Sequence, residues 1–273
     1  MPTTTIHQVR IHYEQAGSGA AIVFLHGLGS CGQDWLLQTP AFEQRFHVIT
    51  PDLRGHGQTD KPQGGVRVAH LTRDVIGLMD ALKIDRAHVV GLSLGGCVAQ
   101  QLALDAPKRV RSLTLVNTFA HLEPDSPRHA LMLVSRLGLL GLKGLPAQAE
   151  YVAARLFPKP EQAEFRQLAA ERIAANEPAT YRRLLFAVRA FDVRNRLHEI
   201  KRPTLVIAGD RDTTVPIKAK RLIAERIPGA RMEIVADSGH ATPIDQPEVF
   251  NRLVLSFIES NGISPQRHHG TKA

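Results

Sequence analysis

Short apolar runs alternate with longer segments of helical periodicity along most of the chain. Each run is apolar through nearly its whole length, as expected of a strand in a parallel sheet that is covered on both faces. The runs span residues 21–26, 47–52, 87–93, 111–117, 204–210 and 231–237. Because strands and helices alternate in this way, we predict right-handed βαβ units, an α/β fold and a doubly wound, mostly parallel sheet.

Helical periodicity predicts where several helices of this fold begin and end. Apolar positions recur on one helical face over residues 68–82, a second helix follows residue 93 and ends at Pro107, and a last helix runs over residues 247–262. Residues 3–17 instead alternate between polar and apolar side chains, which predicts an antiparallel hairpin at the edge of the sheet.

One long region interrupts the alternation of strands and helices. Residues 120–199 contain no convincing strand and have the pattern of several consecutive helices. We therefore predict an all-helical cap over residues 120–199, inserted after the sixth strand into a core formed by residues 1–119 and 200–262. Residues 263–273 lack apolar periodicity, and we expect a disordered tail there.

Charge and composition make several classes of protein poor candidates. The formal charge is +8, but the 34 Lys and Arg residues are scattered among 26 Asp and Glu residues, so we expect no nucleic-acid partner. Cys31 and Cys97 show neither a CxxC pattern nor the spacing of metal ligands, and we expect no metal site. The oligomeric state is left open by the sequence.

The sequence also lacks the signals of export and of membrane insertion. Its N-terminus has no apolar signal core. The most lipophilic stretch, residues 130–142, is interrupted by Arg136 and is shorter than the roughly 20 residues that span a bilayer. We therefore expect a cytoplasmic protein without a membrane span.

The stretch Gly91-Leu92-Ser93-Leu94-Gly95 matches the pattern G-x-S-x-G. It lies where a strand is expected to meet a helix, which is the setting of a nucleophile elbow. Glycines two residues to either side permit the strained backbone that projects the serine hydroxyl above the sheet. We therefore predict that Ser93 is a catalytic nucleophile; a capping serine in a Gly-rich turn is the alternative.

A serine hydroxyl needs a neighbouring base to act as a nucleophile at neutral pH. Of the 13 histidines, His240 is our candidate, because it lies in the loop between the last expected strand and the last helix. Reacting groups of an open parallel sheet gather at the carboxyl ends of its strands, and His240 follows such an end. His26 begins a Gly-rich turn, and we expect it to be a buried, hydrogen-bonded structural residue.

The base in turn needs a carboxylate that orients it. The stretch "AGDRDTTVP" offers Asp210 and Asp212 after the strand over residues 204–210. Asp210 ends the strand directly and is suited to fixing the turn through its own backbone. We therefore favour Asp212, with Asp210 as the second choice and Asp245 as the third.

A second Gly-rich stretch, "LHGLGS" over residues 25–30, also follows an expected strand. Attack on an acyl group creates an oxyanion that needs backbone N–H donors. The amide of Leu94, next to the nucleophile, and one from this loop, best that of Leu28, would supply them.

In order along the chain, "HGLG", "DLRGHGQTD", "GLSLGG", "GDRDTTVP" and "SGH" resemble the landmarks of the α/β-hydrolase family. The resemblance covers roughly residues 20–118 and 200–258, and it identifies the helical insertion as the variable lid, or cap, of that family. It implies a catalytic triad of Ser93, Asp212 and His240, and an oxyanion hole formed by the backbone amides of Leu28 and Leu94.

Some members of the family carry the acid after the sixth strand. That place lies near Asn117, which has no carboxylate, so the resemblance reinforces Asp212. A serine at position 93 argues against epoxide hydrolases and haloalkane dehalogenases, which carry aspartate there.

The longer stretches "GLSLGGCVAQQLALDAPKRVRSLTLVNTFAH" and "FDVRNRLHEIKRPTLVIAGDRDTTVP" most resemble the group of 3-oxoadipate enol-lactonase-like proteins and carboxylesterases. The resemblance implies a serine hydrolase that cleaves carboxylic esters or lactones, forms an acyl-enzyme and needs no cofactor. A dedicated 3-oxoadipate enol-lactonase, a thioesterase or lipophilic-ester hydrolase, and a non-catalytic binding protein of this fold are the alternatives. The choice of small-molecule substrate depends on the cap and is left open.

Overall fold

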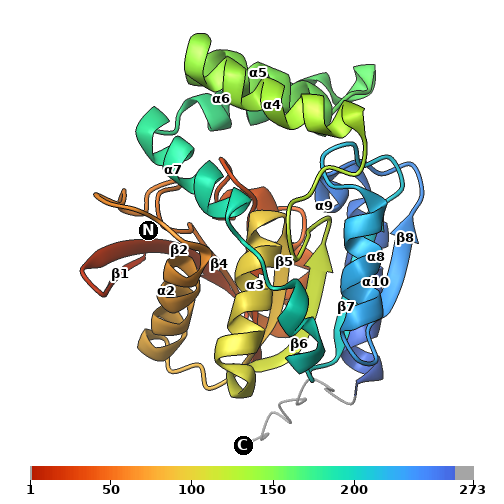
Figure 1. Cartoon of the computed structure of the whole chain (residues 1–273). Helices are drawn as coiled ribbons and strands as arrows, with labels where there is room; N and C mark the ends of the chain where they lie inside the picture. Colours follow the sequence, from red (N-terminus) through yellow and green to blue (C-terminus); the bar gives the residue numbers. More distant parts are fainter. Residues whose placement is uncertain (1, 262–273) are drawn as a thin grey trace, which may run out of the picture.

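A computed structural model describes residues 2–261, in which eight strands form one sheet with helices packed against it (Figure 1). The strand order is β1-β2-β4-β3-β5-β6-β7-β8. β1 pairs antiparallel with β2, and β2 pairs antiparallel with β4, whereas the pairs from β4 through β3 to β8 are all parallel. The predicted α/β class, mostly parallel sheet and edge hairpin are therefore confirmed. The strands are β1 Thr3–Ile6, β2 Val9–Ala16, β3 Ala20–Leu25, β4 Phe46–Pro51, β5 Ala87–Leu92, β6 Val110–Val116, β7 Thr204–Gly209 and β8 Arg231–Val235.

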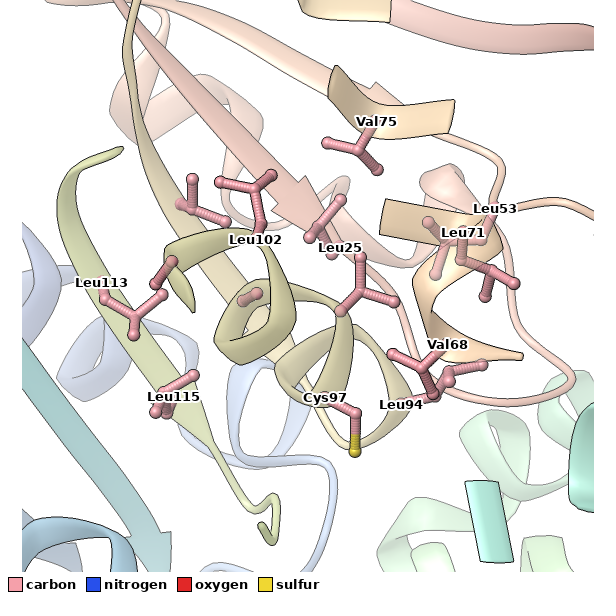
Figure 2. Packing of buried hydrophobic residues seen from close by; sticks show 14 of the residues in the cluster. Leu25, Leu53, Val68, Leu71, Val75, Leu94, Cys97, Leu102, Leu113 and Leu115 are labelled. Atoms are coloured by element: carbon pink, nitrogen blue, oxygen red, sulfur yellow. The ribbon is translucent and has the colours of Figure 1, made fainter. Parts of the chain in front are cut away.

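The central strands are apolar throughout because their two faces supply two separate hydrophobic clusters. In β3, Val23 and Leu25 belong to a cluster that also contains residues of helices α2, α3 and α8, whereas Ile22 and Phe24 belong to one that contains residues of α1 and α10. Successive side chains of a strand point to opposite faces, so both faces require apolar residues. Figure 2 shows part of the first cluster, where Leu25 lies near side chains of α2 and α3.

The helices against the sheet cover both of its faces. The first face carries α2 Val68–Ala81, α3 Leu94–Asp105 and α8 Ile217–Arg226, and the second carries α1 Thr39–Phe42 and α10 Pro247–Ser260. The sequence prediction omitted α8, because this helix is rich in charged residues and buries only Lys220 and Ile223. The short elements are η1 Gly32–Trp35, η2 Pro107–Arg109, η3 Pro160–Gln162, η4 Arg194–Glu199 and α9 Thr242–Asp245.

Residues between β6 and β7 form a group of helices that lies above one end of the sheet (Figure 1). They are α4 Pro127–Leu142, α5 Gly144–Leu156, α6 Ala163–Ala174 and α7 Pro178–Arg189. We call residues 120–199 the helical insertion. An isolated bridge between His121 and Asp192 joins the two ends of the insertion. Its status as a domain of its own stays a prediction, and the expected tail, residues 263–273, lies outside the described residues.

Across residues 2–261, no helix combines the length and the apolar composition that crossing a membrane would require.

Candidate active site

Ser93 lies at the junction that the G-x-S-x-G pattern predicted. β5 ends at Leu92 and α3 begins at Leu94, so Ser93 alone forms the turn between them. Its φ of 53° and ψ of −114° are unusual for a residue other than glycine. Three hydrogen bonds hold the strained turn. The Ser93 N–H donates to the carbonyl oxygen of Val116 at 3.0 Å, and the carbonyl oxygen of Ser93 accepts from the Thr118 hydroxyl at 2.7 Å and from the Cys97 N–H at 3.1 Å.

The two glycines around Ser93 are required by close backbone approaches. A Cβ atom on Gly91 would lie 2.3 Å from the carbonyl oxygen of Gly95. A Cβ atom on Gly95 would lie 2.0 Å from the carbonyl oxygen of Leu25, at the end of β3. Such distances are far inside van der Waals contact, so a side chain at either position would force the strand and helix apart. The glycines therefore let α3 begin directly against the ends of the strands.

His240 and Asp212 are in direct contact. His240 lies in the loop between β8 and α9, and its Nδ1 is 2.9 Å from Oδ2 of Asp212, which follows β7. Because a carboxylate only accepts hydrogen bonds, Nδ1 carries a proton, and Nε2 is the lone-pair nitrogen of the neutral ring. The backbone N–H groups of Thr214 and Val215 donate to the other carboxylate oxygen at 2.8 and 3.1 Å. Asp212 therefore holds a proton-accepting imidazole in one orientation.

The two other carboxylates considered in the sequence hold the turns around this pair. Asp210 accepts a hydrogen bond from the N–H of Ser238 at 3.1 Å. Asp245 accepts one from the N–H of Gly239 at 2.7 Å and another from the amide of Gln162 in the helical insertion at 2.8 Å. Asp212 is thus the carboxylate, of the three, that is hydrogen-bonded to the imidazole of His240.

Lys220 is a member of this cluster that sequence reasoning missed. Its Nζ lies 2.7 Å from Oδ2 of Asp212, and both side chains are almost completely buried. Burial alone would raise the pKa of the Asp212 carboxyl, but His240 and Lys220 outweigh burial and hold this pKa far below its usual range. Burial lowers the pKa of Lys220, and the charge of Asp212 opposes that effect. A lysine in a charge-rich helix carries no sequence signal of burial.

Asn117 is a second residue whose importance comes from its contacts. It is completely buried at the end of β6. Its amide nitrogen donates to the carbonyl oxygen of His240 at 2.9 Å and to the hydroxyl of Thr242 at 2.8 Å. Its amide oxygen accepts from the N–H of Gly209, the last residue of β7, at 2.9 Å. Asn117 therefore connects the end of β7 to the loop that carries His240.

The Gly-rich loop over residues 25–30 lies against Ser93. A Cβ atom on Gly27 would be 3.7 Å from the Cβ of Ser93. His26 is completely buried, its Nδ1 lies 2.8 Å from the carbonyl oxygen of Gly27, and its Nε2 accepts from the N–H of Leu53 at 2.9 Å. Burial lowers the pKa of His26. The prediction of a buried, hydrogen-bonded structural histidine is confirmed.

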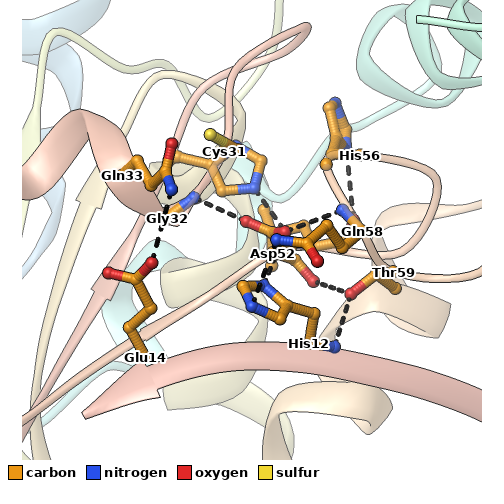
Figure 3. A network of polar contacts seen from close by, with 12 residues as sticks. His12, Glu14, Cys31, Gly32, Gln33, Asp52, His56, Gln58 and Thr59 are labelled. Carbon is orange, nitrogen blue, oxygen red and sulfur yellow. Dashed lines mark hydrogen bonds and ion pairs between the residues drawn. The ribbon is translucent and has the colours of Figure 1, made fainter. Parts of the chain in front are cut away.

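Asp52 ties Gly32, two residues after this loop, to the rest of the core (Figure 3). Its carboxylate accepts from the N–H of Gly32 at 2.7 Å, from the N–H of Gln58 at 2.9 Å and from the imidazole of His12 at 2.9 Å. The stretch "DLRGHGQTD", which contains Asp52, was recognisable in the sequence only as a family landmark and did not predict this network, because its members come from three separate segments of the chain. A buried carboxylate with several donors is rigidly placed, so the chain that leaves the Gly-rich loop is fixed at Gly32.

A cavity of about 200 Å³ lies between the sheet and the helical insertion. Ser93, His240, Leu28 and Leu94 all line it, which brings four of the five predicted site residues to one place, with Asp212 behind His240. Within residues 2–261, Ser93 and His240 are not joined by a hydrogen bond. Most other lining residues are apolar and include Leu133, Val152, Phe165 and Ile173 of the insertion.

The cavity contains the groups needed for nucleophilic catalysis. A hydroxyl on a strained turn and an imidazole fixed by a carboxylate line the same space. Cys97 is an unsuitable nucleophile, since burial raises the pKa of its thiol to about 12. Among residues 2–261, no three His, Cys, Asp or Glu side chains cluster in a way that could hold a metal ion.

Most of the chain is similar to one family of known proteins. A family model described as the alpha/beta hydrolase fold matches residues 20–247. A protein of Variovorax paradoxus named as a putative carbamate hydrolase RutD is 36% identical over 257 residues, which cover 91% of this chain and 96% of that protein. The 3-oxoadipate enol-lactonase 2 of Acinetobacter baylyi is 30% identical and covers 94% of this chain and 96% of its own.

Solved structures are similar over nearly the whole chain. The crystal structure of an enol-lactonase from Burkholderia xenovorans superposes with a TM-score of 0.87 at 30% identity, covering 94% of this chain and 100% of that one.

Proposed function

This chain is a hydrolase of the alpha/beta hydrolase fold family, and from that premise we propose that it is a serine hydrolase of carboxylic esters or lactones. The observation that carries the proposal is the contact of His240 with buried Asp212 beside a cavity that also exposes Ser93. The three residues would form the catalytic triad, with Ser93 as nucleophile, His240 as base and Asp212 as the acid that orients it.

The reaction proposed for this triad has two steps, acylation of Ser93 and hydrolysis of the acyl-enzyme. His240 Nε2 takes the proton of the Ser93 hydroxyl as its oxygen attacks the carbonyl carbon. The tetrahedral intermediate collapses, the bond to the leaving oxygen breaks, and His240 returns its proton to that oxygen. Water, deprotonated by the same imidazole, then attacks the acyl-enzyme; the bond between the acyl carbon and the Ser93 oxygen breaks, His240 returns the proton to that oxygen, and the acid is released. Asp212 keeps the imidazole in one tautomer and stabilises its positive charge in both steps.

The backbone N–H groups of Leu28 and Leu94 would form the oxyanion hole. Neither N–H has an acceptor among the backbone hydrogen bonds of residues 2–261. Leu94 is the first residue of α3, so its N–H belongs to the positive end of the helix. Leu28 follows Gly27, which lies against Ser93. Two free donors beside the nucleophile are the arrangement that stabilises a developing negative oxygen.

The helical insertion, residues 120–199, would act as a cap domain on a core of residues 1–119 and 200–262. Arg172 of α6 forms an ion pair with Asp34, and the amide of Asn176 donates to the carbonyl oxygen of Gly29 at 3.1 Å. These contacts lie on the Gly-rich side of the cavity, and the Gln162–Asp245 contact lies on the His240 side. The insertion therefore lies over the cavity and supplies much of the wall against which a substrate would rest.

The nucleophile is tested with the Ser93→Ala variant. We expect hydrolysis of short p-nitrophenyl esters to fall by at least about a thousandfold, while the thermal unfolding midpoint stays within a few degrees. A fluorophosphonate probe should label the wild-type protein once and the variant not at all. Unchanged turnover in the variant would refute the assignment, and absence of labelling in the wild type would favour a non-catalytic binding protein.

A substrate panel separates the remaining alternatives. The panel holds aryl esters, enol-lactones, thioesters of increasing acyl length and carbamates, the last because relatives are named as putative carbamate hydrolases. Turnover per labelled site should be highest for an ester or a lactone. A much higher rate on an enol-lactone would identify a dedicated enol-lactonase, and a preference for long acyl thioesters would identify a thioesterase.

A further inference from the structure

The cavity beside Ser93 carries more positive than negative side chains. Among the described residues, the charged side chains along its wall are Arg136, Arg172, Arg189 and Asp34. Arg172 is paired with Asp34. Arg136 and Arg189 have no carboxylate partner within residues 2–261, so the wall of the cavity keeps an excess of positive charge.

Arg136 is held in place by a buried amide. It lies on α4 and is partly buried, and Gln148 of α5 is completely buried beside it. With its amide nitrogen turned toward α4, Gln148 donates to the carbonyl oxygen of Arg136 at 2.9 Å and accepts from its Nε at 3.2 Å. This contact orients the guanidinium and leaves both Nη nitrogens unpartnered within the described part of the chain. Two parallel N–H donors are the geometry that matches a carboxylate.

A fixed guanidinium at the wall of a largely apolar cavity is costly unless an anion accompanies it. Charged groups that lose water are stabilised mainly by an opposite charge with good hydrogen-bond geometry. Arg189 differs, because it is exposed and its Nη1 donates only a long hydrogen bond, of 3.4 Å, to the carbonyl oxygen of Leu122. Of the two unpaired arginines, Arg136 is thus the one held in a fixed orientation.

We propose that Arg136 binds a carboxylate carried by the substrate, so that the preferred substrates are esters or lactones with a negatively charged group away from the reacting carbonyl. This inference rests on the proposed function for its reaction and on the Arg136–Gln148 contact for its substrate class. The excess of basic residues in the whole chain, with a formal charge of +8, favours the approach of such an anion.

The test compares a pair of esters that differ only in charge. Mono-p-nitrophenyl adipate and its shorter homologues carry a free carboxylate, and the corresponding methyl-capped diesters do not. Arg136→Met should lower kcat/KM for the anionic esters by about 10–100-fold and change the capped esters by less than about threefold. Arg128→Met, at an exposed arginine of the same helix that does not line the cavity, is the matched control, in which both series should stay within about threefold of wild type.

A second measurement tests binding of the carboxylate separately from hydrolysis. Binding of monomethyl adipate is titrated calorimetrically to the Ser93→Ala protein with and without Arg136→Met, and the second change should weaken binding at least about tenfold. Equal affinities, or equal losses on the charged and capped esters, would overturn the carboxylate site. A protein that binds the anion through Arg136 but hydrolyses neither series would contradict the proposed function and support this site.

A second, independent observation concerns Lys220. Its Nζ and the Nδ1 of His240 share a single oxygen, Oδ2 of Asp212, at 2.7 and 2.9 Å. Within residues 2–261, Lys220 has no further polar partner, and its side chain is only 1% exposed. Burying a lysine costs several kcal/mol unless a charge compensates it. Because burial of Lys220 is costly, its position against this carboxylate indicates that it has a role at the site.

We propose that Lys220 is a positioning residue that moderates the basicity of the His240 imidazole by partly neutralising the charge of Asp212. The positive imidazole that forms during acyl transfer is stabilised by the carboxylate, and a second cation on the same oxygen weakens that stabilisation. The acid limb of the activity profile would therefore lie at lower pH than it would without Lys220. The charge of Asp245 also interacts with that of His240, and this carboxylate accepts hydrogen bonds from the N–H of Gly239 and the amide of Gln162.

The test is the pH profile of kcat/KM for p-nitrophenyl acetate. In Lys220→Met, the midpoint of the acid limb should move upward by about one pH unit. Lys220→Gln, which is also neutral but keeps a hydrogen-bond donor, should move it in the same direction. Lys218→Met, at an exposed lysine of the same helix, is the control and should leave the midpoint unchanged. Lower activity in both Lys220 variants without a shift of the midpoint would overturn the proposal.

Discussion

The side-chain amide of Asn117 donates a hydrogen bond to the backbone carbonyl oxygen of His240 at 2.9 Å, across 123 positions of the sequence. The same amide also bonds the Thr242 hydroxyl and the N–H of Gly209. The loop that carries the imidazole is therefore fixed by a buried side chain that need not touch substrate. Asn117 also has a φ of 42°, a conformation that asparagine adopts more readily than most residues.

Asn117→Ala should lower both stability and turnover. The substitution leaves the N–H of Gly209 and the carbonyl oxygen of His240 without this partner, which costs about 2–4 kcal/mol in the free energy of unfolding. Because the imidazole loses its support, kcat on p-nitrophenyl esters should fall more than KM changes. Urea unfolding and steady-state kinetics measure the two effects. A variant with wild-type kcat would show that Asn117 does not hold the His240 loop.

Gly95→Ala should destabilise the protein by more than about 3 kcal/mol. The new methyl group would lie 2.0 Å from the carbonyl oxygen of Leu25, a backbone atom that cannot rotate away. The matched control is Gly138→Ala in α4, where an added Cβ atom would meet no described atom within 4 Å beyond its chain neighbours and its own helix backbone, and where alanine favours the helix by about 1 kcal/mol. Denaturant midpoints compare the two, and similar midpoints would contradict the close packing of α3 against β3.

His88 should make the protein less stable in acid. Burial lowers its pKa to about 4, with a smaller contribution from the charge of Arg111. The unfolded chain takes up a proton near the usual histidine value of about 6.5, whereas the folded protein keeps His88 neutral down to about pH 4. The contribution of neutral His88 to the free energy of unfolding is therefore complete above about pH 6.5. It is lost as the pH falls toward 4, and the whole loss is about 3 kcal/mol.

Urea unfolding at about pH 7 and about pH 4.5 measures this loss. In His88→Leu, the free energy of unfolding should fall by about 2–3 kcal/mol less over that interval than in wild type. His198→Gln, at an exposed histidine, serves as the control and should follow the wild-type curve. Coincident pH dependences for wild type and His88→Leu would mean that His88 is protonated in the folded protein.

Much of the fold could be predicted because its signals are local. A central strand of a parallel sheet contributes to two hydrophobic clusters, as Ile22 and Val23 do on opposite faces of β3, so its sequence is apolar without interruption. The turn at Ser93 needs small residues on both sides, and this requirement is visible in the sequence because Gly91 and Gly95 belong to the five-residue pattern G-x-S-x-G. The helix α8 gave no such signal, because it buries only Lys220 and Ile223.

The amino-acid sequence by itself determined the class of fold, the order of its elements and the candidate hydroxyl, imidazole and carboxylate, because chain geometry and hydrophobic periodicity act over a few residues. Only the tertiary structure decided the partners: that Asp212 rather than Asp210 or Asp245 contacts His240, and that Lys220 is buried against it. Partners depend on which chain ends the folded sheet brings together, and burial then sets how strongly the charges act on one another.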